Sequence, residues 1–185
     1  MRTYTRINED FLDNDTLDTE EQSMRDEICL DIVHCIHDGA QPPLDLTSLP
    51  DAFYPVTNKD ELSKIIELCM SLYGNECSLN WIDVSHINIM LNLFSNSMFN
   101  GDISRWDVSH VTNMSGMFFG CSGLTSIDVS QFDTSKVKYI NQMFQDCTSL
   151  NELDLSNFSL GSVDYMYSMF YNCSALKKLT IGPIA

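Results

Sequence analysis

Apolar residues in the C-terminal half of the chain recur with a period of 26 positions. The segments 106–131, 132–157 and 158–185 align without gaps. Each contains a Met-Phe pair, a cysteine and a leucine at matching positions, which is typical of an internal structural repeat. The matching residues are Met117-Phe118, Met143-Phe144 and Met169-Phe170, then Cys121, Cys147 and Cys173, then Leu124, Leu150 and Leu176. An irregular fourth copy, residues 82–105, precedes them and has Leu93-Phe94 at the Met-Phe position.

The first part of each copy predicts a short helix. Val111, Met114 and Met117 follow one another at intervals of three, which places them on one helical face. Asp107 and Ser109 stand just ahead of them and are candidates for the helix N-cap.

The second part of each copy predicts a strand. Leu124, Ile127 and Val129 have the L-x-x-L-x-L spacing of a leucine-rich-repeat strand, and their alternation with polar residues predicts one inward and one outward face. One copy cannot bury its apolar face alone, whereas stacked copies can. We therefore expect an α/β repeat fold: a short leucine-rich-repeat-like β/α solenoid of about four coils, extending roughly 20 Å.

A helix is predicted just before the repeats. Asn58 and Glu61 have the spacing of a capping box, and Gly74 is placed to end the helix. The apolar residues between them form a helical stripe: Leu62, Ile65, Ile66, Cys69, Leu72 and Tyr73. We expect this helix to cover the N-terminal end of the solenoid, as terminal caps do.

The chain is expected to have three parts. Residues 1–25 are an acidic segment expected to include disorder, and residues 26–80 form a helical cap region. The cap region contains a second predicted helix, 26–37, and a Pro-rich connector, 38–55. Residues 81–185 form the solenoid.

The chain is strongly acidic, with 10 Lys and Arg against 26 Asp and Glu and a net charge of −16. Because a polyanion is repelled by nucleic acids and anionic membranes, we expect the protein to bind neither of them directly. No apolar run approaches the roughly 20 residues needed to cross a bilayer. The first residues lack the apolar region of a signal peptide. We expect a cytoplasmic protein, or one at the cell surface if a leader has been removed.

Nine carboxylates fall between Glu9 and Glu27. This run is either a solvated, partly frayed segment or a surface for a basic partner. The residues that would form such a surface are Glu9, Asp10, Asp13, Asp15, Asp18, Glu20 and Glu21.

Seven cysteines, an odd number with no export signal, favour reduced thiols. Cys29, His34, Cys35 and His37 lie close together but alternate with apolar residues, which favours a buried helix over a zinc site. The recurring cysteines of the repeat are expected to pack as small buried hydrophobes. We predict no metal and no cofactor.

The repeat resembles the BspA-type leucine-rich repeat family, best known from bacterial surface proteins. The resemblance is carried by WDVSHVTNMSGMFFGCSGLTSIDVS (106–130) and its copies, and extends upstream through NKDELSKII (58–66), LNWIDVSHI (79–87) and FNGDISRWDVSHVTNM (99–114). It covers about 55–185 and implies a bacterial solenoid with a leucine-rich-repeat fold.

We expect a non-enzymatic module that binds a basic protein surface. Solenoids commonly present their strand face to partners, and the outward carboxylates there are Asp102, Asp128, Glu152 and Asp154. No G-x-S-x-G, H-E-x-x-H or phosphate-cradling glycine loop occurs. His86 and His110 occupy equivalent positions, which we expect to be solvated turns rather than a catalytic site.

Two other functions stay open. A small acidic phage-type inhibitor would mimic nucleic acid and block a nucleic-acid-binding enzyme, as an anti-CRISPR or other anti-defence protein does. A bacterial surface adhesin fragment would require a leader. The apolar C-terminal end of the array is expected to pair with another chain as a homodimer, to be covered by the tail, or to stay open.

Overall fold

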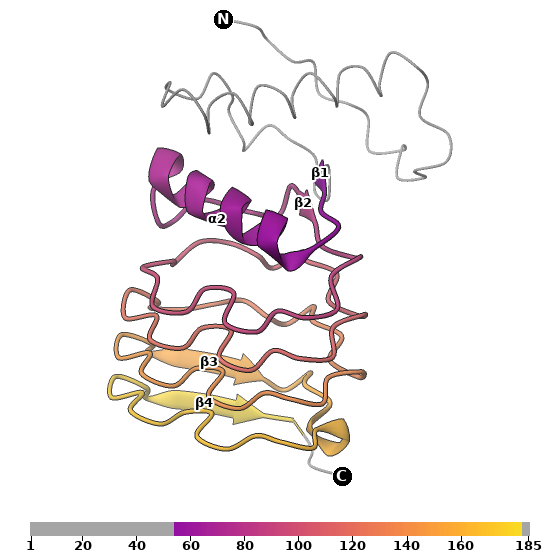
Figure 1. The fold of residues 1–185 in the computed structure, drawn as a ribbon. Coiled ribbons are helices and arrows are strands. Elements are labelled where there is room, and N and C mark those ends of the chain that lie inside the picture. The colour runs from indigo at the N-terminus through magenta and orange to yellow at the C-terminus, as the bar shows by residue number, and fades with distance from the viewer. Residues whose placement is uncertain (1–53, 183–185) are drawn as a thin grey trace, which may run out of the picture.

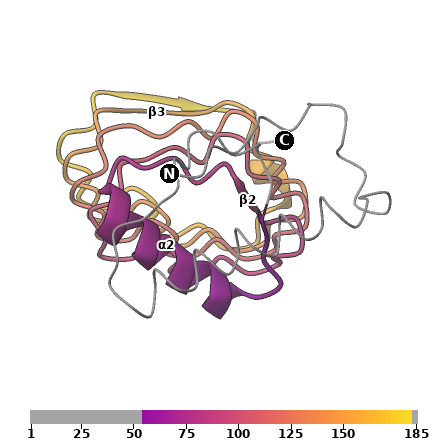
Figure 2. The same ribbon diagram turned by 90° about the horizontal axis from the view of Figure 1, so that it is seen from above.

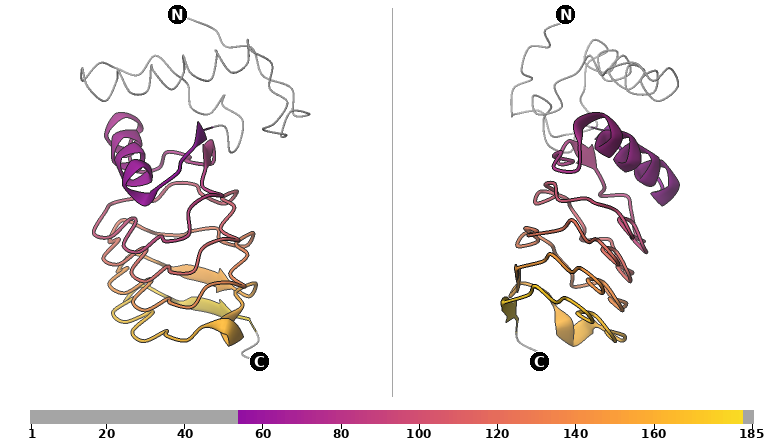
Figure 3. Two further views of the ribbon diagram at one scale, coloured as in Figure 1. Left: turned by 45° about the vertical axis from the view of Figure 1, so that its right-hand side comes forward. Right: turned by 90° about the vertical axis from the view of Figure 1, so that its left-hand side faces the viewer.

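The computed structural model describes residues 54–182, and the predictions made for residues 1–53 lie outside this range. In the described part, helix α2 lies over one end of a stack of chain turns (Figure 1). Each of the four repeat copies forms one layer of this stack, as the two side views in Figure 3 show. Within residues 54–182 the fold is a mixed α/β arrangement with one α-helix, short parallel strand pairs and a buried aromatic cluster.

Helix α2, Lys59–Tyr73, has the bounds that its capping residues predict. The side chain of Asn58 accepts a hydrogen bond from the Glu61 amide at 2.9 Å. The Glu61 carboxylate in turn accepts from the Thr57 amide at 3.1 Å, one residue earlier than a capping box predicts. At the other end Gly74 adopts φ 87°, and its amide bonds to the carbonyl of Met70. The predicted stripe is buried at Leu62, Ile65, Ile66 and Cys69.

Every strand pair and bridge in the described residues is parallel. Strand β1, Tyr54–Pro55, pairs with β2, Ile82–Asp83, and β3, Glu152–Leu155, pairs with β4, Lys178–Ile181. Isolated bridges join the other layers: Ser78–Asp102, Ile89–Asn113, Asn113–Tyr139 and Tyr139–Tyr165. A short 3₁₀ helix, η2, spans Leu160–Ser162. Seen from above, α2 runs along the side opposite β3 (Figure 2).

The helix predicted in each copy is wrong. The segments 89–96, 113–120, 139–146 and 165–172 form successive turns, and together they make one wall of the stack, here called the turn wall. In each segment two residues four positions apart have a positive φ, which an α-helix of L-residues does not allow. They are Asn92 and Asn96, Gly116 and Gly120, Gln142 and Asp146, and Ser168 and Asn172.

The predicted N-caps are therefore Asx turns rather than helix starts. Asp107 accepts a hydrogen bond from the amide of Ser109 at 3.0 Å, and Asp133 accepts one from Ser135 at 3.0 Å. An aspartate that bonds the amide two residues later forms a turn by itself. No α-helix follows these aspartates in the described chain.

The predicted strands form in only two of the copies. β3 and β4 fall where the spacing predicts them, but the equivalent segment around Ile127 forms no strand. There the amide of Thr125 bonds to the side chain of Asn100 at 2.9 Å. A side-chain acceptor takes the place of a backbone carbonyl, so the regular ladder does not begin.

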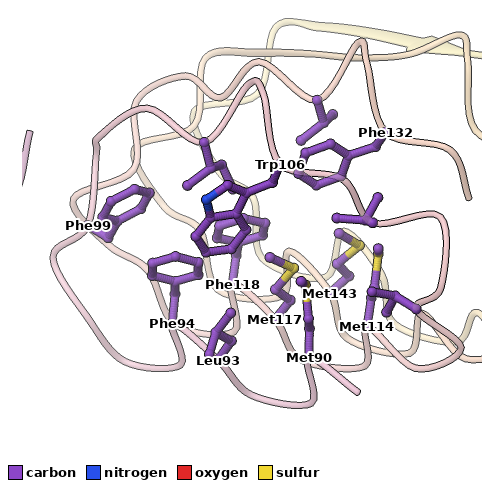
Figure 4. Packing of buried hydrophobic residues seen from close by; sticks show 14 of the residues in the cluster. Met90, Leu93, Phe94, Phe99, Trp106, Met114, Met117, Phe118, Phe132 and Met143 are labelled. Carbon is purple, nitrogen blue, oxygen red and sulfur yellow. The ribbon is translucent and has the colours of Figure 1, made fainter. Parts of the chain in front are cut away.

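The Met-Phe pairs form the core, as predicted. Met117, Phe118, Met143 and Phe144 have no exposed surface. The phenylalanines stack from layer to layer, with ring centroids 5.3 Å apart for Phe94–Phe118 and for Phe118–Phe144. Figure 4 shows this packing, with Trp106 lying above Phe94, Phe118 and the labelled methionines in this view. Leu124 and Leu150 are also buried, and Leu176 is half-buried in the last layer.

Candidate functional site

Three of the predicted site residues form a column along the stack. Asp102, Asp128 and Asp154 occupy equivalent positions in successive layers and are exposed. Each accepts a hydrogen bond at 2.9 Å from the amide of the serine two residues later: Asp102 from Ser104, Asp128 from Ser130 and Asp154 from Ser156. One carboxylate oxygen of each aspartate therefore stabilises a turn of the backbone. The sequence analysis did not predict this structural role.

The members of this column differ in their remaining contacts. The other carboxylate oxygen of Asp102 accepts from the buried Asn80 side chain at 2.8 Å, so this residue is tied to the fold at both oxygens. The hydrogen bond from the Ser156 amide lowers the pKa of the Asp154 carboxyl, with a smaller contribution from the Lys178 charge. Glu152 lies 3.9 Å from Lys178, but both side chains are well exposed, and such a pair contributes little.

A second acidic column, missed by the sequence analysis, repeats the same turn. Asp83, Asp107 and Asp133 each accept from the amide of the serine two residues later. Hydrogen bonds from the hydroxyl and amide of Ser135 lower the pKa of Asp133. The recurring D-x-S spacing was the signal that could have located both columns. The remaining predicted contacts, Glu9, Asp10, Asp13, Asp15, Asp18, Glu20 and Glu21, lie outside the described residues.

The turn wall carries exposed tyrosines on its outer face. Tyr139, Tyr165, Tyr167 and Tyr171 are exposed by 39%, 53%, 61% and 65%. The rings of Tyr139 and Tyr165 stack, with centroids 5.4 Å apart and 9° between their planes. These four residues, here called the tyrosine patch, all belong to the last two layers. The sequence analysis missed them, although tyrosine at positions that alternate with the buried Met-Phe pair is a visible signal.

The cysteines of the repeat form a column with its own hydrogen bonds, buried at Cys121 and Cys147 and half-buried at Cys173. The thiol of Cys121 donates to the carbonyl of Phe94 at 2.9 Å, Cys147 donates to Phe118 at 3.0 Å, and Cys173 donates to Phe144 at 2.9 Å. Burial raises the pKa of Cys121 to about 11 and raises that of Cys147 further. Since the thiolate is the nucleophile, these thiols are inert at neutral pH.

Neither a metal site nor a spanning helix is found within residues 54–182. No group of three or more His, Cys, Asp or Glu side chains in this range is arranged to hold a metal ion. In the same range no helix has the length and apolar character needed to cross a bilayer.

Comparison with known proteins relates this repeat to a family. Residues 61–181 match the family described as "Mycoplasma protein of unknown function, DUF285". The chain belongs to this family. No curated protein and no solved structure matches the chain. The match to the DUF285 family covers helix α2 from Glu61 onward and the stack as far as Ile181, so the acidic columns and the tyrosine patch lie within the family's shared region.

Proposed function

We propose that the protein is a non-enzymatic protein-binding module, with the tyrosine patch as the centre of its binding surface. The observation that carries the proposal is the clustering of Tyr139, Tyr165, Tyr167 and Tyr171, all exposed, on one wall. Tyrosine is enriched in protein interfaces because it offers a large rigid apolar area together with a hydroxyl. A row of exposed rings in one place is what a binding hot spot needs.

We further propose that the stack is a short leucine-rich-repeat-type solenoid of the BspA kind. The 26-residue period, the parallel bridges between equivalent residues and the stacked phenylalanines support this assignment. Helix α2 would be its N-terminal cap, as its place in Figure 1 suggests.

The partner we propose has a basic surface. The acidic column formed by Asp102, Asp128 and Asp154 is exposed and would attract a basic surface. Complementary charges at an interface raise the association rate more than they raise affinity. In this proposal the tyrosines hold the complex, whereas the carboxylates guide its approach.

The test compares two sets of variants in capture of partners from a host lysate. Tyr167→Ala with Tyr171→Ala should reduce capture of the main partner at least tenfold, since each removes a large exposed ring. Leu91→Ala with Ile89→Ala is the control, because both are exposed apolar residues of the same wall in the first layer, Leu91 at the position of Tyr167 and Ile89 at that of Tyr165. Equal capture by the tyrosine variant and the control would refute the proposed surface.

Charge reversal tests the role of the acidic column. Asp128→Lys with Asp154→Lys should slow association several-fold at low salt and leave the dissociation rate nearly unchanged. Partner capture that is insensitive to both salt and charge reversal would remove the basic partner from the proposal while leaving the tyrosine patch in place.

A nucleic-acid-mimicking inhibitor is the second candidate, favoured by the net charge of −16. Such an inhibitor would compete with DNA or RNA for its target, and high salt would weaken the complex sharply. A captured target that still accepts nucleic acid would exclude this function.

A further inference from the structure

An asparagine is followed directly by a glycine once in the sequence, at Asn100-Gly101. Both residues are half-buried and lie two positions or fewer before Asp102 of the acidic column. The pair belongs to the contact between the first two layers, because the amide of Asn100 donates to the carbonyl of Asn75 at 2.8 Å. Its side chains and backbone are therefore held by the stack rather than by a free loop.

The side chain of Asn100 is held through its oxygen. Its Oδ1 atom accepts from the amide of Thr125 at 2.9 Å and from the hydroxyl of Thr125 at 3.0 Å. Because an N–H group can donate only to the oxygen of a carboxamide, these bonds fix which end of the group faces Thr125. The other end, Nδ2, has no acceptor among the residues that the structure describes.

Packing between the first two layers requires the glycine. A Cβ atom at residue 101 would lie 2.1 Å from the carbonyl oxygen of Cys77 and 2.8 Å from the ring of Phe99, so no larger residue fits. The same lack of a side chain leaves the Gly101 nitrogen open to the neighbouring carboxamide. Within residues 54–182 no acceptor for the Gly101 amide is found.

The two donors of Thr125 lie where negative charge develops when this pair reacts. After losing its proton to hydroxide, the Gly101 nitrogen attacks Cγ of Asn100, which closes a ring and moves the charge onto Oδ1. Donors that are already placed on such an oxyanion lower the barrier, and the two reacting groups need no encounter because they are neighbours in the chain.

The reaction then needs only water. Nδ2 takes a proton from water and leaves as ammonia when its bond to Cγ breaks, and the product is a cyclic succinimide. A second water opens the ring at one of its two carbonyls, which gives aspartate or isoaspartate. Overall, Asn100 gains one water and loses one ammonia, with no oxidation or reduction.

We propose that Asn100-Gly101 is a self-modification site, at which the fold promotes conversion of Asn100 to aspartate and isoaspartate through the two donors of Thr125. The conversion places a new carboxylate beside Asp102 and changes the net charge from −16 to −17. Isoaspartate also adds one carbon to the backbone between the bonds of Asn100 and Asp102 to the first layer. The proposal does not depend on the function proposed above.

Incubation of the full chain in mildly alkaline buffer, followed by proteolysis and mass spectrometry, tests the proposal. The fragment with Asn100 should show the mass increase of an amide-to-acid change, and isoaspartyl methyltransferase should label it. Hydroxylamine should cleave the chain between residues 100 and 101, because it traps the succinimide. Asn157, which is followed by Phe158, is the internal control and should stay unchanged.

A synthetic peptide with the sequence of residues 95–106 separates the effect of the fold from that of the residue pair. The folded chain should convert Asn100 at least as fast as this peptide does, because the peptide lacks Thr125. Slower conversion in the folded chain would show that the fold protects Asn100 and would overturn the proposal.

Two variants test the donors directly. Thr125→Val removes the hydroxyl but keeps the shape of the side chain, so conversion of Asn100 should slow about tenfold. Thr125→Ser keeps the hydroxyl and should convert at nearly the rate of the parent protein. Thr125 is exposed, so both variants should fold, which circular dichroism checks. Conversion of Thr125→Val at the parent's rate would also overturn the proposal.

Discussion

The ring of Phe118 stacks on the ring of Phe144 with centroids 5.3 Å apart and 9° between their planes. Because Phe118 also stacks on Phe94 at the same spacing, its ring joins three successive layers. We therefore expect the stability of the stack to depend on this residue, as on Phe144, which stacks on Phe118 and Phe170.

Phe118→Ala should lower the free energy of unfolding by about 3–5 kcal/mol, since it removes a fully buried ring and leaves a cavity between two layers. Urea denaturation measures the change. Phe119→Ala is the matched control, because Phe119 is the next residue but points outward and is only half-buried. A similar loss for both variants would show that the stacked column has no special role.

The backbone conformation of the turn wall predicts that two substitutions change the stability of the protein in opposite directions. Gly120 has φ 68°, and a Cβ atom there would lie 2.4 Å from the side-chain oxygen of Asn96. Gly120→Ala should therefore destabilise the protein by about 2 kcal/mol. Ser168→Gly should stabilise it by about 0.5 kcal/mol, because Ser168 has φ 54° and glycine adopts this conformation freely. Thermal unfolding of both variants would contradict this explanation if the two shifts had the same sign.

The buried thiols predict a loss of stability at alkaline pH. Burial raises the pKa of Cys121 to about 11 from 9.0, so the folded state holds the thiol proton more tightly than the unfolded state. The resulting stability is fully present below pH 9 and is lost as the pH rises toward 11. Cys121→Ser keeps a donor for the Phe94 carbonyl but does not titrate in this range. Its urea midpoint should fall less steeply than that of the parent protein between pH 9 and pH 11, and equal slopes would refute the assignment.

The acidic turns predict a loss of stability at the other end of the pH range. The pKa of Asp154 is lowered, first by the hydrogen bond from the Ser156 amide. A lowered folded-state pKa stabilises the protein above the ordinary value of 3.8, and this stability disappears as the pH falls below that value. Asp154→Asn keeps an acceptor for the Ser156 amide but does not titrate. In this variant the turn should therefore contribute equally to the free energy of unfolding at pH 7 and at pH 3. Asp154→Ala should be less stable than Asp154→Asn at both pH values.

Helix α2 and the identity of the core could be predicted from the sequence because each depends on local signals. Asn58 and Gly74 mark the helix ends by their own chemistry. Burial of the Met-Phe pairs follows from periodicity alone, since a repeated apolar pair needs a shared interior.

The conformation of the turn wall could not be predicted in the same way. Apolar intervals of three suit a helix and a series of turns equally, and the deciding feature is a positive φ at every fourth residue. Glycine at such positions would indicate a positive φ, but Asn92, Gln142 and Ser168 occupy them as well. Contacts between layers impose the conformation there, and the residue types do not reveal it. The exposure of the tyrosines could not be predicted for the same reason, because their outward direction follows from the turns.

In the turn wall, backbone amides of one layer donate to carbonyls of the next layer toward the C-terminus. Because this pattern repeats, the length of the stack can change only by whole layers. Each of the two middle layers receives four amides from the layer before it and donates four to the layer after it, so a complete middle layer can be duplicated or deleted with both junctions preserved. An insertion of one residue within the wall, in contrast, would turn the Met-Phe column toward water in every position that follows it. Duplication or deletion of a whole layer is therefore the change in length that this bonding pattern accommodates.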